Sequence, residues 1–369
     1  MSFNYEDCTT KTLDRLTLLS RITDVDRGDP SMPCLSETRF IKLTLPEPQP
    51  VPKVDQNDFT INKQEATPEK VLDIMKTFGV CKVKQLFTVE EIDQINKELD
   101  PFFQAKKDDP RLFPRETVKI TETISKSPQV VHKIMSHPLN LGVTHLALDQ
   151  ANVFWIGENL NIGFSPATVA SSIGFEIHPG AAGQPLHRDD QSEHNIRRPQ
   201  TPQTFDYRNE TQIGFSVALS DTTIENGATR FIPGSHLWDH LQKPNQEDCI
   251  QNTMKKGDAT FMLASVVHSA APNITENEVR RILIMFMGRG NSKSKENNYI
   301  NCDFNYLKQF SVEQLTRMGF RMSEPYGNML ELQDPLTFIK DDYRRRANYS
   351  EVCKAVSYTH LRAHETGAY

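Results

Sequence analysis

The chain has 369 residues, of which 37% are hydrophobic and 24% are charged, and its formal net charge is −6 at pH 7. This length and composition are sufficient for one large globular domain with a sizeable core. The negative charge gives no electrostatic basis for nucleic acid as a partner, and no apolar run reaches the length of a membrane span. The N-terminal segment does not resemble a secretory signal, and the six cysteines form no Cys-x-x-Cys pair. We therefore expect a cytoplasmic protein with reduced thiols.

The two ends of the chain differ from its centre. Residues 1–60 are rich in proline and weakly periodic, and we interpret them as an N-terminal arm or linker lying on a main domain at residues 61–350. Residues 355–369 resemble translated cloning or sequencing-adaptor sequence more than natural protein. The natural C-terminus is therefore uncertain, and the sequence gives no test of a peroxisomal signal there.

Helices are predicted first along the chain. Thr67, Pro68 and Glu69 combine an N-cap, a proline at the first helical position and an acid near the positive end of the helix dipole. The helix that they open is predicted to end at Phe78, because Gly79 is typical of a helix C-terminus.

More helical structure is predicted as far as about residue 150. Residues 79–87 indicate a short strand, and Thr88 with Glu91 forms a capping-box pattern that opens a second helix. Residues 127–148 indicate a further helical stretch.

After about residue 150 the hydrophobic pattern changes to period two, which predicts strands. The clearest segments are SSIGFEIHPG (171–180), QIGFSVALSD (212–221), ATFMLASVVHSA (259–270) and RRILIMFMG (280–288). Helices followed by many short strands favour a mainly β fold, a sandwich or jelly roll with an N-terminal helical layer.

One short segment contains a candidate metal-binding pair. QPLHRDDQSEH (184–194) includes His187 and Asp189, the only His-x-Asp pair in the chain. In an extended strand these two side chains point to the same face and could converge on one ion. Taken alone, the pair is equally compatible with a solvated loop.

Three ordered blocks carry a resemblance to a known family. They are QPLHRDD (184–190), SDTTIENGATRFIPGSH (220–236) and KGDATFMLASVVHSAAPNITENEVRR (256–281). Together they resemble the phytanoyl-CoA dioxygenase superfamily of iron(II)- and 2-oxoglutarate-dependent oxygenases, over roughly residues 65–340. The resemblance implies a double-stranded β-helix, also called a jelly roll.

Two later segments are most similar to the fungal secondary-metabolite branch of that superfamily, which makes alkaloid and terpenoid products. They are GRGNSKSKENNY (288–299) and MGFRMSEPYGNMLELQDP (318–335). Members of the family are often dimers, and the composition neither supports nor excludes a homodimer for this chain.

The resemblance implies a set of metal ligands and catalytic residues, namely His187, Asp189 and His268. Two neutral imidazoles and one carboxylate on one face of an ion form the facial triad of non-haem iron(II) oxygenases, and the opposite face stays open. Because His268 lies far along the chain from the other two residues, only the fold can bring it to the ion.

The same resemblance implies which residues bind the co-substrate 2-oxoglutarate. Arg280 falls on the arginine that grips its distal carboxylate, although Arg281 adjoins it and both faces of the predicted strand are apolar. An arginine inside an apolar barrel needs an anionic partner, and a bidentate carboxylate would provide one. Thr229 and Gln184 fall on positions that contact the co-substrate carboxylates in relatives.

The residues that bind the substrate are less clearly marked. Phe175, Tyr207, Arg208 and Phe215 are candidates for the pocket. Arg197 belongs with Arg208 to a group of arginines that follows the His-x-Asp segment. We interpret this group as a solvated surface, with recognition of an acidic substrate as the alternative.

The resemblance implies that 2-oxoglutarate and O2 are converted to succinate and CO2 while an unactivated C–H bond of a small secondary metabolite is oxidised. Hydroxylation, desaturation and oxidative cyclisation of an alkaloid, a terpenoid or a prenylated amino acid, including kainoid-type ring closure, are all compatible with the sequence. Alternative functions are a metal-dependent hydrolase or isomerase that does not use 2-oxoglutarate, and a catalytically silent binding module.

Overall fold

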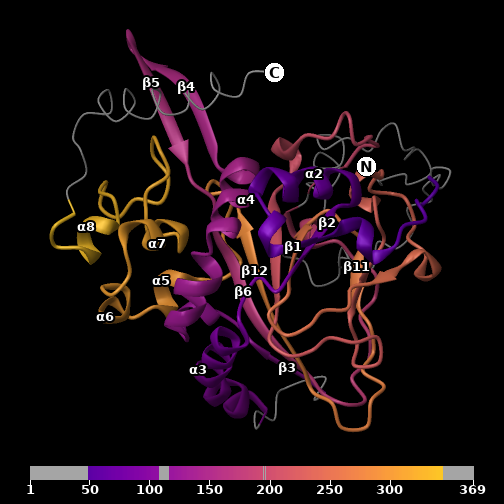
Figure 1. Ribbon diagram of the computed structural model, residues 1–369. Helices are drawn as coiled ribbons and strands as arrows, with labels where there is room; N and C mark the ends of the chain where they lie inside the picture. The colour runs from indigo at the N-terminus through magenta and orange to yellow at the C-terminus, as the bar shows by residue number, and fades with distance from the viewer. Residues whose placement is uncertain (1–48, 108–115, 194, 196, 344–369) are drawn as a thin grey trace, which may run out of the picture.

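The computed structural model describes residues 49–107, 116–193, 195 and 197–343 of the chain. Two sheets at its centre carry most of the strands, and helices cover one of them (Figure 1). Most of the expected N-terminal arm and all of the unusual tail lie outside the described residues. The described part of the arm lies on the domain: η2 (Gln56–Phe59) contributes Phe59, which is fully buried.

The large sheet has seven strands in the order β1-β2-β10-β7-β12-β6-β3. The strands are β1 (Thr60–Asn62), β2 (Val80–Lys84), β3 (Thr117–Ile120), β6 (Thr168–Ile177), β7 (Gln212–Ala218), β10 (Ala259–Leu263) and β12 (Arg280–Gly288). Only β1 and β2 pair in parallel, and the other neighbours are antiparallel.

The small sheet has three strands, β11 (His268–Ala270), β8 (Thr229–Phe231) and β9 (Ile250–Gln251), in that order. Asn252, directly after β9, donates a hydrogen bond from Nδ2 to Oγ1 of Thr260 on β10, and both residues are buried. The small sheet therefore faces the large one, and the predicted jelly roll with an N-terminal helical layer is confirmed.

The strand register divides the large sheet into two faces. Along β12, Ile282 and Ile284 lie opposite Ala218 and Ser216 of β7, on the face turned toward the small sheet, here called the inner face. Residues at odd positions of β12, such as Leu283, lie on the outer face, which packs against the helices. Directly opposite residues of an antiparallel pair share a face, so the register assigns every side chain of these strands.

The outer face is covered by the N-terminal helices α2 (Pro68–Phe78), α3 (Val89–Lys107) and α4 (Pro138–Leu148). The predicted start and end of α2 are confirmed: Oγ1 of Thr67 accepts from the backbone N–H of Lys70, and Gly79 has a φ of 81°. At this left-handed C-cap a side chain would be strained. The capping box of α3 is confirmed by reciprocal hydrogen bonds between Thr88 and Glu91.

The predicted helical stretch 127–148 is divided in the structure. A π-helical segment, η5 (Val130–Met135), precedes α4, which begins at Pro138. Proline cannot donate the hydrogen bond that a continuous helix would need at this position, so a new helix starts there.

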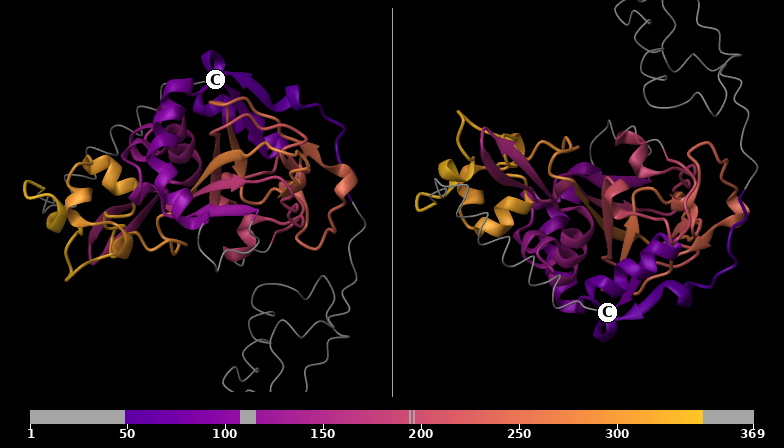
Figure 2. Two further views of the ribbon diagram at one scale, coloured as in Figure 1. Left: turned by 90° about the horizontal axis from the view of Figure 1, so that it is seen from below. Right: turned by 90° about the horizontal axis from the view of Figure 1, so that it is seen from above.

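Two regions of the fold have no counterpart in the sequence expectations. The hairpin β4 (Gln150–Ile156) and β5 (Asn159–Ser165) projects from the domain, and four short helices follow β12 (Figure 1). These helices are α5 (Asn298–Asn301), α6 (Phe304–Leu307), α7 (Val312–Arg317) and α8 (Leu336–Ile339). They lie at one end of the molecule and the small sheet lies at the other (Figure 2). None of the helices in the described ranges is both long and apolar enough to cross a membrane.

Candidate metal centre

Three potential metal ligands meet between the two sheets. His187, Asp189 and His268 each offer a ligand atom, and these atoms lie within 4.8 Å of one another. Nε2 of His268 is 3.4 Å from Oδ2 of Asp189, and Nε2 of His187 is 3.9 Å from Oδ1 of the same carboxylate. The Oδ2 atom of Asp189 is buried and makes no hydrogen bond to any described residue.

Local hydrogen bonds orient both imidazoles in the same way. Nδ1 of His187 lies 2.9 Å from the carbonyl oxygen of Pro185, and Nδ1 of His268 lies 3.0 Å from that of Val266. Because a carbonyl oxygen only accepts, each Nδ1 donates, and each neutral ring then has its lone pair on Nε2. This orientation by a backbone carbonyl is the usual arrangement of metal-binding histidines. Burial, which is opposed by Asp189, lowers the pKa of His268 and so favours its neutral form.

A pairing between distant segments explains how the ligands meet. His187 and His268 form an antiparallel bridge with two backbone hydrogen bonds, of 2.9 and 3.0 Å. Directly opposite residues in such a bridge point to the same side, so both imidazoles face the interior. The amide of Asp189 donates to the carbonyl of Ala264, which fixes the carboxylate segment against the turn before β11.

The predicted co-substrate residues Gln184 and Thr229 both lie next to Ala270, two residues beyond His268. The side-chain Oε1 of Gln184 accepts from the backbone N–H of Ala270, and the backbone N–H of Gln184 donates to the carbonyl of Ala270. Thr229 lies opposite Ala270 in the pairing of β8 with β11. The structure thus brings both residues close to the histidine.

Arg280 lies at the start of β12 on the inner face, with the same orientation as Ile282. Its side chain is among the largest fully buried ones, yet Nε and Nη1 have no hydrogen-bond partner among the described residues. Burial lowers its pKa to about 10, still well above neutral pH. Within the described ranges, the guanidinium of Arg280 is therefore a buried cation without a partner anion, which is unfavourable unless a ligand supplies the anion.

Arg281, the next residue, lies on the outer face and has partners. Its Nε donates to Oε1 of Glu176 at 2.7 Å, and its Nη1 pairs with Asp100. The guanidinium also lies 5.0 Å from the centroid of the Phe103 ring. The two arginines that the sequence could not separate by periodicity thus differ completely in their surroundings.

The predicted substrate residues are not brought together. Phe175 lies opposite Ile282 on the inner face. Phe215 lies on the outer face, where it stacks on Phe261 in the helical core, so it is not directed toward the metal cluster. Tyr207 packs against that core and donates from its hydroxyl to the carbonyl of Leu72.

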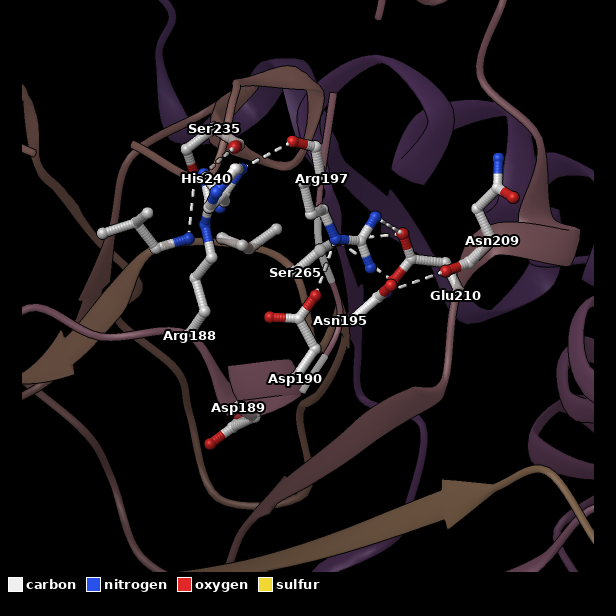
Figure 3. Close-up of polar contacts among 12 residues, drawn as sticks. Arg188, Asp189, Asp190, Asn195, Arg197, Asn209, Glu210, Ser235, His240 and Ser265 are labelled. Carbon is white, nitrogen blue, oxygen red and sulfur yellow. Dashed lines mark hydrogen bonds and ion pairs between the residues drawn. The ribbon is translucent and has the colours of Figure 1, made fainter. Parts of the chain in front are cut away.

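Arg208 and Arg197, which we expected on a solvated surface, differ in exposure. The Arg208 side chain is 89% exposed and pairs with Asp206, as expected. Arg197 is 3% exposed and makes two ion pairs, with Asp190 and with Glu210 (Figure 3), so its solvated interpretation was wrong. The sequence reasoning missed this network, because the only signal is an acid directly after the metal-binding aspartate.

A cavity of about 1060 Å³ lies between the β4–β5 hairpin, residues 290–299 and residues 318–328. Most of the residues that line it are polar or charged, among them Lys295, but apolar atoms supply the larger part of its surface. Nζ of Lys295 lies 3.9 Å from Oε1 of Glu193, in the short helix η6 (Asp189–Glu193) that begins with the carboxylate of the candidate metal cluster. The same ammonium lies 5.6 Å from the centroid of Phe286 on the inner face. One residue of the cavity wall, Lys295, therefore pairs with the helix that begins at Asp189.

Comparisons with known proteins agree with this site. The family model described as phytanoyl-CoA dioxygenase (PhyH) matches residues 75–282. The protein named dioxygenase peniF of Penicillium patulum is 30% identical over 267 residues, covering 72% of this chain and 87% of that protein. Dioxygenase cnsJ of Penicillium expansum is 28% identical over 295 residues, covering 78% of this chain and 88% of that protein.

A third relative is named for its cofactors. The iron/alpha-ketoglutarate-dependent dioxygenase penM of Penicillium thymicola is 25% identical over 256 residues, covering 66% of this chain and 73% of that protein. The prediction of an enzyme of this class, with iron and 2-oxoglutarate, agrees with this name and with the His-Asp-His cluster. The family match spans both ends of that cluster as well as Arg280, and we conclude that the chain belongs to the phytanoyl-CoA dioxygenase family.

Proposed function

We propose that this protein is an iron(II)- and 2-oxoglutarate-dependent dioxygenase in which His187, Asp189 and His268 hold the iron and Arg280 binds 2-oxoglutarate. The single observation that carries this proposal is the buried, unpartnered guanidinium of Arg280, on the inner face of the barrel that also contains the three ligands. A dicarboxylate supplies the anion that this cation lacks.

The side chains fit the group that they would hold. Two imidazoles with free Nε2 lone pairs and one carboxylate are the donor set of the facial triad, and they leave further positions on the ion open. The buried Oδ2 of Asp189 has no hydrogen bond from any described residue, and a cation would satisfy it. The same donors also suit zinc, but a zinc hydrolase would leave Arg280 without a role.

When bound, iron(II) would supply, with 2-oxoglutarate and O2, the oxidising power for an unactivated C–H bond, and succinate and CO2 would be the co-products. The side chains of this protein would orient 2-oxoglutarate and exclude water from it. Arg280 would hold the distal carboxylate, since its Nε and Nη1 are donors that no described residue uses, and this would orient the keto-acid end. Ile177, Ala218 and Ile282 form an apolar cluster on the inner face and exclude water from the co-substrate.

We further propose that the organic substrate is a small secondary metabolite that binds in the cavity beside η6. The resemblance of residues 288–299 and 318–335 to the fungal branch supports this, since both segments contribute to the cavity lining. Its lining combines many polar side chains with a larger apolar surface, which suits a compact metabolite that has both hydrogen-bonding and apolar parts. Arg197 and Arg208 are both paired with carboxylates, so they give no support to an acidic substrate or to kainoid-type ring closure.

An anaerobic calorimetric titration tests this function. 2-Oxoglutarate is titrated into protein loaded with Fe(II), and into protein without metal. We expect tight binding only to the loaded protein, followed in air by substrate-dependent release of succinate across a panel of alkaloids and terpenoids. Metal binding without any affinity for 2-oxoglutarate would instead support the hydrolase or isomerase alternative.

A further inference from the structure

A buried ion-pair network lies beside Asp189, one of the three residues of the metal cluster (Figure 3). Nε of Arg197 donates to Oδ2 of Asp190, and Nη1 of Arg197 donates to Oε1 of Glu210, both at 2.6 Å. Ser265 completes the network by donating from Oγ to the Glu210 carboxylate, at 2.9 and 3.0 Å to its two oxygens. All four residues are at least 97% buried.

This network connects the two chain segments that carry the ligands. Asp190 follows Asp189 directly, and Ser265 lies in the turn that leads into β11 and His268. The amides of Asp189 and Asp190 both donate to the carbonyl of Ala264, the residue before Ser265. Arg197 and Glu210 therefore form a side-chain link between segments whose backbones already touch.

The side chains around the ligands alternate in direction. His187 and Asp189 contribute to the metal cluster, whereas the carboxylate of Asp190 points to Arg197 and away from Asp189 (Figure 3). Arg188 also points away: its Nη2 donates to the carbonyl of Ser235 at 3.2 Å. His187 and Asp189 thus contribute to the cluster while Arg188 and Asp190 anchor the segment, where the bridge at His187 leads into the short helix η6.

We propose that the Asp190–Arg197–Glu210 network is a positioning device for the metal centre, which holds the Asp189 carboxylate and the His268 imidazole at ligand distance from each other. This inference rests on the proposed metal function. The network residues touch neither metal nor substrate, so they act through Asp189 and His268. Groups that orient metal ligands commonly change metal affinity about 10- to 100-fold when they are removed.

The first test compares metal binding by two arginine variants. Arg197→Met removes the link without adding a charge, and Arg317→Met is the matched control. Arg317 is also largely buried and pairs bidentately with Asp149, at 2.6 and 2.9 Å, but it belongs to α7, outside the network. Metal dissociation constants are measured by anaerobic calorimetry with Mn(II), and thermal unfolding is measured in parallel.

We expect Arg197→Met to weaken Mn(II) binding about 10- to 100-fold. Arg317→Met should lower the melting temperature by a comparable amount and leave Mn(II) binding within about twofold, since its ion pair lies outside the network. Arg197→Lys should restore part of the affinity, because it keeps one charged contact. Equal Mn(II) affinities of wild type and Arg197→Met, or equal losses in both arginine variants, would overturn the proposal.

A milder pair of variants keeps the test decisive if Arg197→Met does not fold. Ser265→Ala and Glu210→Gln each remove one contact of the network and should weaken Mn(II) binding severalfold. The paramagnetic resonance spectrum of bound Mn(II) should broaden in these variants, which general destabilisation alone would not cause. If wild type itself binds no divalent metal, the proposed function fails; if wild type binds and these variants bind equally well, only the positioning role fails.

Discussion

The two faces of strand β12 carry neighbouring arginines that have opposite surroundings. On the outer face, Arg281 pairs with Glu176 and Asp100 and lies over the Phe103 ring. On the inner face, Arg280 is 2% exposed, and its Nε and Nη1 have no partner in the described part of the chain. Two adjacent residues of β12 therefore differ: Arg281 has carboxylate partners, and Arg280 has none among the described residues.

This difference distinguishes a structural charge from a functional one. The charge of Arg281 is satisfied within the fold, since this partly exposed side chain pairs with Glu176 and Asp100. A buried cation without an anion costs folding free energy, and it is tolerated where a ligand completes it. The inner face thus carries a cation that no described residue pairs, in the same interior as the cluster of His187, Asp189 and His268, and we propose a carboxylate of 2-oxoglutarate as its partner.

The largest expected effect tests whether the inner face is a metal and co-substrate site at all. Asp189→Ala or His268→Ala removes one of three ligands, and we expect Mn(II) affinity to fall by more than about 100-fold with no detectable succinate release. Calorimetry and a succinate assay check this. Turnover retained in both variants would contradict the ligand assignment.

The next prediction concerns the unpaired arginine on the inner face, Arg280. Arg280→Met removes the cation but preserves much of the volume, so the KM for 2-oxoglutarate should rise by about 100-fold or more, while Mn(II) binding stays unchanged. Without ligands, the free energy of unfolding should stay equal or rise by about 1 kcal/mol or more, because an uncompensated charge is removed. Steady-state kinetics and urea unfolding measure the two quantities; a strong loss of stability would indicate that Arg280 has a structural partner.

The matching prediction concerns the paired arginine on the outer face, Arg281. Arg281→Met leaves Glu176 without its cation, so unfolding should require about 1–3 kcal/mol less than in wild type. The KM for 2-oxoglutarate should stay within about twofold, since this side chain is directed to the helical layer. A large rise in KM would transfer the co-substrate role from Arg280 to Arg281.

The smallest expected effect is that of replacing Arg208, a solvent-exposed arginine that serves as a reference for Arg280 and Arg281. Arg208→Ala removes a side chain that is 89% exposed and paired only at the surface, so stability should change by no more than about 0.5 kcal/mol. Succinate release with the enzyme's own substrate should be unchanged. A rise in the KM for that substrate would restore Arg208 as a binding residue and favour an acidic substrate.

Much of the local structure could be predicted because its causes are local. The ends of α2 follow from the side chain of Thr67 and from the left-handed backbone of Gly79, both of which act within one helical turn. The period-two pattern of residues 280–288 marked β12, since the side chains of a strand alternate between two faces. Pro138 also gave a local signal, and the predicted stretch 127–148 overlooked it.

Parts of the site could not be predicted because both faces of a strand can be apolar. Phe215 was expected near the substrate, yet the register of β7 with β12 turns it to the helical core. Arg197 was expected in solvent, although Asp190 and Glu210 enclose it. In both cases the partners lie on other elements, and the chain pattern contains no information about which element will lie opposite.

The sequence by itself determined where helices begin, where strands alternate and which residue types could bind a metal and a keto acid. Only the tertiary structure decided that His268 meets His187 through a backbone bridge, and that Arg280 rather than Arg281 faces the interior. The physical reason is that capping and periodicity act over a few residues. Convergence of ligands and pairing of buried charges depend on the register between strands that are distant in the chain.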